Sequence, residues 1–150
     1  MKLSPTATVR PSISQLLSGS TPLGLVAGDK DALHVIREPG RYICTEDVRA
    51  ERGRAAVRIE ADDVVLDLAG HSLVGDGATV SGVEVSGARC NIVIRAGIVR
   101  GWGGHGVDVS QAVGSRVEDV MAADNSGMGV MPGTGCTLDS VLLERNGSRR

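Results

Sequence analysis

Short apolar segments recur along this chain at nearly constant intervals. Four of them share one pattern: a small residue, then Val, then any residue, then an apolar residue or Pro. These segments are residues 56–59, 82–85, 106–109 and 129–132, and their starts lie 26, 24 and 23 residues apart. Alternating apolar and polar positions are typical of a β-strand with one buried face. The pattern therefore predicts that the chain returns to the same strand position once in each repeat.

Two further apolar segments follow each of these strands. The second strands are expected at residues 64–68 and 92–94 and around Val117 and Leu138, and the third at residues 73–74, 98–99, 120–122 and 141–143. The last two repeats match most closely: Val117, Val120, Ala122 and Asn125 recur 21 residues later as Leu138, Val141, Leu143 and Asn146. Three short strands in a coil of 21 to 26 residues predict an all-β fold, a right-handed parallel β-helix (solenoid) of about four to five coils. The hexapeptides of a left-handed β-helix and the fixed leucines of a leucine-rich repeat are not found in the sequence.

The beginning of the chain differs from the rest. Residues 1–30 are rich in Pro, Ser, Thr and Gly, and we expect them to form an N-terminal lead and cap. The β-helix is expected to occupy residues 31–150. Residues 12–17 would form a short helix that covers the open first coil, because solenoids need capped ends. An incomplete first coil is expected over residues 32–48.

The composition favours a narrow core. Of the 150 residues, 41% are hydrophobic, yet the chain has one Trp, one Tyr and no Phe, and it has 21 Gly. A round core normally depends on large aromatic rings. A thin solenoid is filled instead by Val, Ile, Leu and Ala, and its many turns use Gly.

Charge and hydropathy exclude several classes of partner. The net charge is −2, with 16 basic and 18 acidic residues, which argues against nucleic-acid binding. No segment reaches the roughly 18 apolar residues that span a membrane, so no membrane contact is expected. No secretory signal peptide is visible, and we expect a cytoplasmic protein unless a signal has been removed.

Two residue types recur at the spacing of whole coils. Cys44, Cys90 and Cys136 are separated by 46 residues each, which places neighbours two coils, or about 9–10 Å, apart. Because a disulfide needs Cα atoms within about 7 Å, all three are expected to be free. Asn125 and Asn146 are expected to stack at one turn, hydrogen-bonded to each other and to the turn backbone.

Three segments carry a family resemblance. They are residues 36–43, which contain Pro-Gly-Arg-Tyr, residues 61–71, and residues 91–104, which end in Trp-Gly-Gly. Through them, residues 34–127 resemble the bacterial right-handed parallel β-helix repeat proteins of the pectin-lyase-like superfamily. The resemblance implies the β-helix fold. Its functional implication is broad, because the superfamily includes polysaccharide lyases, hydrolases, epimerases and phage tailspikes.

Fragments of the polygalacturonase motifs are also present. Asp62 and Asp63 match the Asp-Asp motif, and His105 with its flanking glycines matches Gly-His-Gly. The Asn-Thr-Asp and Arg-Ile-Lys motifs are not found, nor is the Asp-Pro-His-Asp pattern of alginate epimerases. The Asp pair and His105 are nearly two coils apart, farther than one site would hold. The sequence leaves open whether the chain is an enzyme; if it is one, the resemblance implies a polysaccharide substrate.

A column of charged side chains is expected on the outside of the first strand of each coil. The column and the loop residues just before its strands are Arg58, Glu84, Asp108, Met131, Asp76, Trp102 and His105. Glu84 and Asp108 are the candidate catalytic carboxylates, with His105 as the base. Trp102 would stack on a sugar, and Arg58 and Asp76 would contact the substrate. The alternative is a solvated face with ordinary pairing of Arg58 and Glu84. No cofactor is expected, although Glu84 and Asp108 could share a Ca²⁺ ion.

An apolar column is expected along the third strands. Two adjacent apolar residues occur there in every coil, although strand alternation buries only one of them. The expected outward members are Val74, Val99, Met121 and Leu142. An exposed apolar column predicts self-association, first as a homotrimer, as in laterally packed β-helices of the resembled families, and second as a dimer. The alternative is a local bulge that buries both residues.

Two functions remain open at this point. The first is a carbohydrate-directed protein that binds or cleaves a glycan. The second is a non-catalytic structural or assembly module that forms a homo-oligomer.

Overall fold

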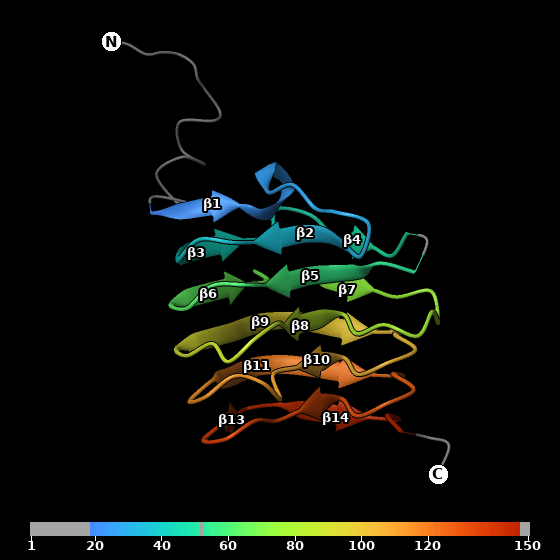
Figure 1. Ribbon diagram of the computed structural model, residues 1–150. Helices are drawn as coiled ribbons and strands as arrows, with labels where there is room; N and C mark the ends of the chain where they lie inside the picture. Colours follow the sequence, from blue (N-terminus) through green and yellow to red (C-terminus); the bar gives the residue numbers. More distant parts are fainter. Residues whose placement is uncertain (1–18, 52, 148–150) are drawn as a thin grey trace.

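The computed structural model describes residues 19–51 and 53–147. In this part of the chain the protein is an all-β solenoid of about five turns, with parallel strands stacked along one axis (Figure 1). A 3₁₀-helix of one turn, η1 (Leu23–Leu25), is the single helical element there. The predicted parallel β-helix is confirmed. The predicted helix over residues 12–17 lies outside the described residues.

The smaller of two sheets contains the first strand of each coil. Its five strands are β2 (Ala32–Ile36), β5 (Ala55–Ile59), β8 (Val83–Val85), β10 (Val107–Asp108) and β12 (Val130–Met131). Val57, Val83, Val107 and Val130 pair in register, which confirms the predicted repeat.

The larger sheet contains nine strands. They are β1 (Ser20–Pro22), β3 (Gly40–Ile43), β4 (Val48–Arg49), β6 (Val64–Asp67), β7 (Ser72–Val74), β9 (Ile92–Arg100), β11 (Arg116–Ala123), β13 (Thr137–Asp139) and β14 (Leu142–Glu144). β9 and β11 are long because each joins the predicted second and third strands of its coil. The joint is one residue in the left-handed region, Ala96 (φ 66°) or Asp119 (φ 53°), which turns the chain while pairing continues on both sides.

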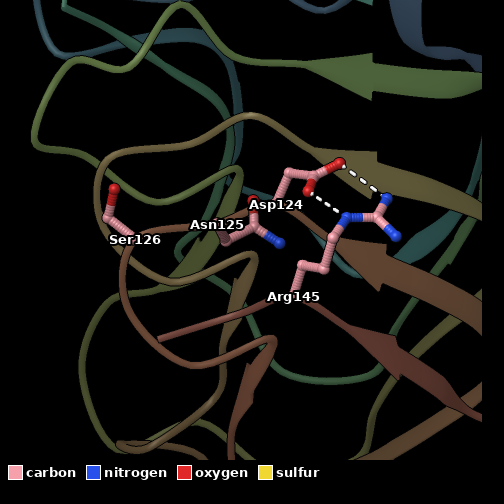
Figure 2. A pocket seen from close by; sticks show the side chains of 4 residues that line it. All are labelled: Asp124, Asn125, Ser126 and Arg145. Carbon is pink, nitrogen blue, oxygen red and sulfur yellow. Dashed lines mark hydrogen bonds and ion pairs between the residues drawn. The ribbon is translucent and has the colours of Figure 1, made fainter. Parts of the chain in front are cut away.

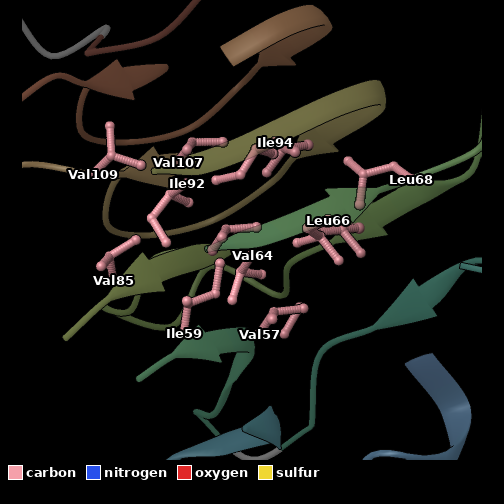
Figure 3. Packing of buried hydrophobic residues seen from close by; sticks show 14 of the residues in the cluster. Val57, Ile59, Val64, Leu66, Leu68, Val85, Ile92, Ile94, Val107 and Val109 are labelled. Carbon is pink, nitrogen blue, oxygen red and sulfur yellow. The ribbon is translucent and has the colours of Figure 1, made fainter. Parts of the chain in front are cut away.

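The core lies between the sheets and is narrow. Figure 3 shows side chains of the smaller sheet, such as Ile59 and Val85, opposite those of the larger sheet, such as Leu66 and Ile94. All four residues are buried, and each pairs in register with its counterpart one coil away, so every inward column is a continuous apolar stack.

Glycine at the start of these strands has a packing cause. A Cβ on Gly82 would lie 2.8 Å from Nε1 of Trp102, and one on Gly106 would lie 2.8 Å from Nδ2 of Asn125. A Cβ on Gly129 would lie 2.7 Å from Nδ2 of Asn146. In these three coils the glycine of the repeat therefore makes room for the Trp or Asn side chain that fills the corner.

The N-terminal end of the solenoid is covered. β1 pairs with β3, so Ser20–Pro22, within the expected lead, belongs to the larger sheet. Leu23 of η1 is 1% exposed and packs into the main core. The loop that follows lies on β2: a Cβ on Gly28 would come within 2.2 Å of two β2 carbonyl oxygens, those of Ala32 and Leu33. We call residues 19–31 the N-terminal cap.

The opposite end is different. We call residues 137–147 the last coil. Leu138 pairs in register with Val117 and Leu143 with Ala122, and both partners are fully buried. Leu138 and Leu143 are nevertheless 45% and 50% exposed. Their side chains occupy inward positions that no further coil covers among the described residues.

Candidate functional site

The predicted charged column is present on the smaller sheet. Arg58 pairs in register with Glu84, Glu84 with Asp108, and Asp108 with Met131. This sheet therefore holds three charged side chains on successive strands, about 4.8 Å from one another.

Arg58 is occupied by partners within the chain. Its guanidinium contacts Asp29 of the N-terminal cap and donates from Nε to Glu60 over 2.8 Å. Glu84 lies farther away, with 4.0 Å between Nη1 of Arg58 and its carboxylate. Arg37 adds ion pairs to Glu60 at 3.6 Å and to Asp29 at 3.8 Å. Arg58 therefore links the N-terminal cap to the first strands. Its guanidinium already has carboxylate partners within the chain, so few of its N–H groups are available to a ligand.

Glu84 is the unusual carboxyl of this column. Burial raises its pKa, the nearby Arg58 guanidinium opposes that effect, and the Asp108 carboxylate adds to it. Asp108 accepts hydrogen bonds from the backbone N–H of Ser110 at 3.0 Å and from its hydroxyl at 2.6 Å. A fixed carboxylate thus lies beside one that holds its proton more tightly than usual, which is the electrostatic arrangement of a general acid or of a hydrogen-bond donor to an oxygen-rich ligand.

His105 has a different neighbourhood. Its Nδ1 accepts the backbone N–H of Met128 at 2.9 Å, and its own backbone N–H donates to Oγ of Ser81 at 3.1 Å. These hydrogen bonds link three successive coils. Neither carboxylate of the column is among the hydrogen-bond partners of His105 within the described residues. The imidazole of His105 therefore has a structural role in the turn, and this geometry does not support its expected role as a base.

Trp102 is the residue at which the structure differs most clearly from the prediction. The side chain is 1% exposed and belongs to the core, so it cannot serve as a stacking platform for a sugar. Its Nε1 donates to the carbonyl of Leu73 at 3.1 Å. Asp76 is exposed, and its carboxylate accepts the N–H of Ala78 at 3.0 Å in a local turn. The expected substrate contact of Asp76 stays a prediction.

Trp102 belongs instead to a corner that it shares with the two asparagines. Oδ1 of Asn125 accepts the backbone N–H of Trp102 at 3.0 Å, and Nδ2 of Asn125 donates to Oδ1 of Asn146 at 2.9 Å. The predicted stacking of the asparagines is confirmed. The third member was missed, although Trp102 lies 23 residues before Asn125, at the spacing of one coil. We call Trp102, Asn125 and Asn146 the asparagine corner.

A shallow pocket lies at this corner (Figure 2). Asp124 and Arg145 line it and form a two-point ion pair, with distances of 2.6 Å and 3.1 Å between nitrogen and oxygen. The hydrogen bonds from Arg145 lower the pKa of Asp124. Because the pair joins the last two coils and uses both carboxylate oxygens, the pocket is best explained as a structural joint.

The predicted apolar column exists, but with different members. Val99 is fully buried, because it pairs with Leu73 and Ala122 on the inward face. Ile98 pairs with Met121, and Met121 with Leu142, so the outward column is Ile98, Met121 and Leu142. Val74 pairs with Arg100 and lies outside it. We call these three residues the apolar ladder. The prediction was wrong by one position for Val99 and by two for Val74, since Ser72 is the residue of β7 that pairs with Ile98.

The remaining sequence motifs have structural roles. Asp62 accepts the N–H of Cys90 at 3.0 Å, and Asp63 accepts Nδ2 of Asn91 at 2.9 Å, so the Asp pair fixes a turn. Cys44, Cys90 and Cys136 are free, as predicted. Burial raises the pKa of Cys44 to about 12.

Metal and membrane features were also considered for the described residues. No group of three or more His, Cys, Asp and Glu side chains in residues 19–51 and 53–147 is arranged to hold a metal ion. No helix in that part of the chain is long and apolar enough to cross a bilayer.

Comparison of the chain with family models, with curated proteins and with solved structures yields no match. The parallel β-solenoid therefore rests on the structure itself, and the pectin-lyase-like resemblance stays a prediction.

Proposed function

We propose that this chain is a structural β-solenoid module that self-associates through its apolar ladder. The observation that carries the proposal is the register of the larger sheet, which pairs Ile98 with Met121 and Met121 with Leu142 on successive coils. Leu142 is 51% exposed, and Ile98 and Met121 are partly exposed. Three outward apolar side chains on neighbouring strands form the kind of patch that marks a contact surface.

The driving force at this surface is the burial of apolar side chains. Removing the exposed part of each ladder side chain from water contributes on the order of 1 kcal/mol. Ile98 and Met121 also line a shallow hollow together with Gly70 and Gly97, which side chains of a second copy would enter.

Light scattering after size exclusion tests the proposal. The wild-type chain is expected to elute as an oligomer, and Met121→Asp is expected to move the mass toward the 15.5 kDa of one chain. Leu25→Asp is the control, since Leu25 is an apolar residue of η1 with 78% exposure that lies outside the ladder. A wild-type mass of one chain at every concentration would refute self-association.

The mass of the oligomer distinguishes the two expected assemblies. A homotrimer, the first expectation, has three times the mass of one chain, and a dimer has twice that mass. In either assembly Met121→Asp should lower the mass, because Met121 lies on the side of the solenoid where copies would pack laterally.

A second function, glycan binding, is favoured by Glu84 and Asp108. Carboxylates on adjacent strands stand at fixed spacing on a rigid sheet, which suits a repeating ligand, and burial raises the pKa of Glu84, which favours its protonated, hydrogen-bond-donating form. Two carboxyls repel acidic sugars, so neutral or amino sugars are the expected ligands. A glycan array probed with wild type, Glu84→Gln and Asp108→Asn tests this, with Asp139→Asn on the larger sheet as control. Equal signals from all four proteins would exclude the column as a glycan site.

A further inference from the structure

We infer that copies of this chain pack side by side with their solenoid axes running in the same direction, through the apolar ladder and the opposite charges on its two sides. The inference rests on the proposed self-association and specifies the polarity of the partner and the charged residues that it contacts. It is drawn from the way unpaired charges are separated across the ladder.

One side of the ladder is basic. Arg49 pairs in register with Val74, and Val74 with Arg100, so the two arginines belong to one outward column of the third strands. Arg100 lies two residues after Ile98 on β9. Both arginines are exposed, and neither takes part in an ion pair among the described residues. Glu144 continues this column on the last coil, but its carboxylate already has an arginine partner there.

The other side of the ladder is acidic. Asp119 lies two residues before Met121 on β11 and lines the shallow hollow with Met121 and Ile98. Glu46 lies just before β4, at the same corner of an earlier coil. Both carboxylates are exposed, and both are absent from the ion pairs of the described part of the chain. The ladder therefore has unpaired carboxylates on one side and unpaired guanidinium groups on the other.

These charges cannot pair with each other inside one chain. Arg100 pairs in register with Ala123, four residues after Asp119, so the two charged residues lie about 13 Å apart along the strand direction. Neighbouring charges on the same sheet behave differently, since Arg95 is paired with Glu118 at 2.9 Å and with Asp67 at 3.2 Å. A second copy at the ladder is what brings the two unpaired sets together.

The separation of the two signs selects the polarity of the partner. When a second ladder faces the first with its solenoid axis parallel, its basic side lies opposite the acidic side of the first copy. When the axes are antiparallel, the basic sides face each other, and so do the acidic sides. Arg100 and Asp119 lie on adjacent coils, about 4.8 Å apart along the axis, so an arginine side chain reaches across in the parallel arrangement. Complementary charge therefore favours a dimer or trimer whose symmetry axis runs along the solenoid.

A charge swap tests the polarity, with dissociation constants measured by analytical ultracentrifugation. Arg100→Glu and Asp119→Arg each place like charges opposite one another in a parallel assembly, and each should raise the dissociation constant at least about fivefold. The double variant restores opposite charges, and its dissociation constant should return to within about twofold of wild type. Asp119→Arg suits the backbone, because Arg145 adopts the same left-handed region with φ 54°. Arg41→Glu is the matched control: Arg41 is exposed on β3, outside the ladder, and its substitution should leave association unchanged.

The salt dependence of the wild-type protein gives a second measurement that needs no substitution. Salt screens the attraction in a parallel assembly and should weaken it, whereas it screens repulsion in an antiparallel one and should tighten it. In a protein that light scattering shows to be oligomeric, tighter association of Arg100→Glu, a double variant no tighter than the single ones, or tightening by salt would overturn the parallel arrangement but not self-association. A wild-type monomer by light scattering would overturn both.

Discussion

The two ends of the described solenoid are covered to different degrees. Each end coil has an inward apolar face and a strand edge that need cover. At the N-terminal end the chain supplies the cover itself, with Leu23 in the core and Asp29 held by Arg58. At the other end Leu138 and Leu143 keep about half of their surface in water. The comparison shows that a repeat pattern specifies the middle of a solenoid, while each end depends on residues outside the pattern.

The difference has a consequence for stability. Residues that cover the N-terminal end contribute to folding of one chain, because their partners are in the same chain. Residues of the last coil contribute less, because about half of Leu138 and of Leu143 already faces water. Substitutions at the two ends should therefore differ in their effect on the free energy of unfolding.

The largest expected effect comes from Leu23→Ala. This change removes a buried side chain from the covered end, and we expect it to lower the free energy of unfolding by about 2–4 kcal/mol. Leu143→Ala shortens a half-exposed side chain, and in dilute protein it should cost about 1 kcal/mol or less. Urea unfolding followed by circular dichroism measures both.

The outcome that would contradict the comparison is an equal loss for the two variants at a concentration where light scattering reports single chains. Leu25→Ala is the matched control for Leu23, since the two leucines flank one residue of η1 but differ in exposure. It should leave the free energy of unfolding almost unchanged.

Substitutions in the asparagine corner are expected to have the next largest effect on stability. Asn125 is buried between two coils and makes hydrogen bonds with Trp102, Val99 and Asn146. Asn125→Ala leaves several buried groups without partners, and we expect a loss of about 2–3 kcal/mol. Asn146 lies on the last coil with water on one side, so Asn146→Ala should cost about 1 kcal/mol. A larger loss at Asn146 than at Asn125 in dilute protein would show that the last coil is as tightly held as the interior.

Much of the fold was predictable because the repeat fixes the register. The spacing of Val57, Val83, Val107 and Val130 placed Arg58, Glu84 and Asp108 on one outward column, and the pairings confirm it. In a parallel stack, one aligned residue per coil aligns its neighbours too. The stacking of Asn125 and Asn146 followed from the same spacing.

The candidate site was less predictable, because side-chain burial at corners does not follow strand alternation. Trp102 was expected in solvent, yet the room left by Gly82 lets its indole enter the core. Val99 was expected outside, but Ala96 turns the chain by one left-handed residue and shifts which of the next residues face inward. The partner of Arg58 in the N-terminal cap, Asp29, lies 29 residues away in a segment without the repeat pattern.

Asp29 allows a pH test of the covered end. Hydrogen bonds from the backbone N–H of Asp31 and from Arg58 hold its pKa below the usual range. A lowered folded pKa means that the carboxylate stabilises the protein above the unfolded pKa of about 4, and that this contribution is lost as the pH falls through the folded value. Asp29→Asn should lower the Tm at pH 7, and the difference from wild type should shrink steadily below pH 4. A difference that stays constant down to the acid limit would mean that the carboxylate charge does not hold the cap.

The pH dependence of stability at Glu84 should have the opposite sign to that at Asp29, although both residues lie beside Arg58. Its effect is expected to be the smallest of the series. Burial raises its folded pKa, so ionisation costs more in the folded protein than in the unfolded chain. That cost is absent below the unfolded pKa of about 4.3, where the carboxyl is protonated in both states, and it is complete above the raised folded value. Glu84→Gln should therefore raise the Tm slightly at pH 7 and leave it unchanged near pH 3.5. Scanning calorimetry of wild type and variant at a series of pH values measures the difference. If Glu84→Gln lowers the Tm at pH 7 instead, attraction to Arg58 outweighs burial, and Glu84 belongs with Asp29 to the ion pairs that fasten the covered end.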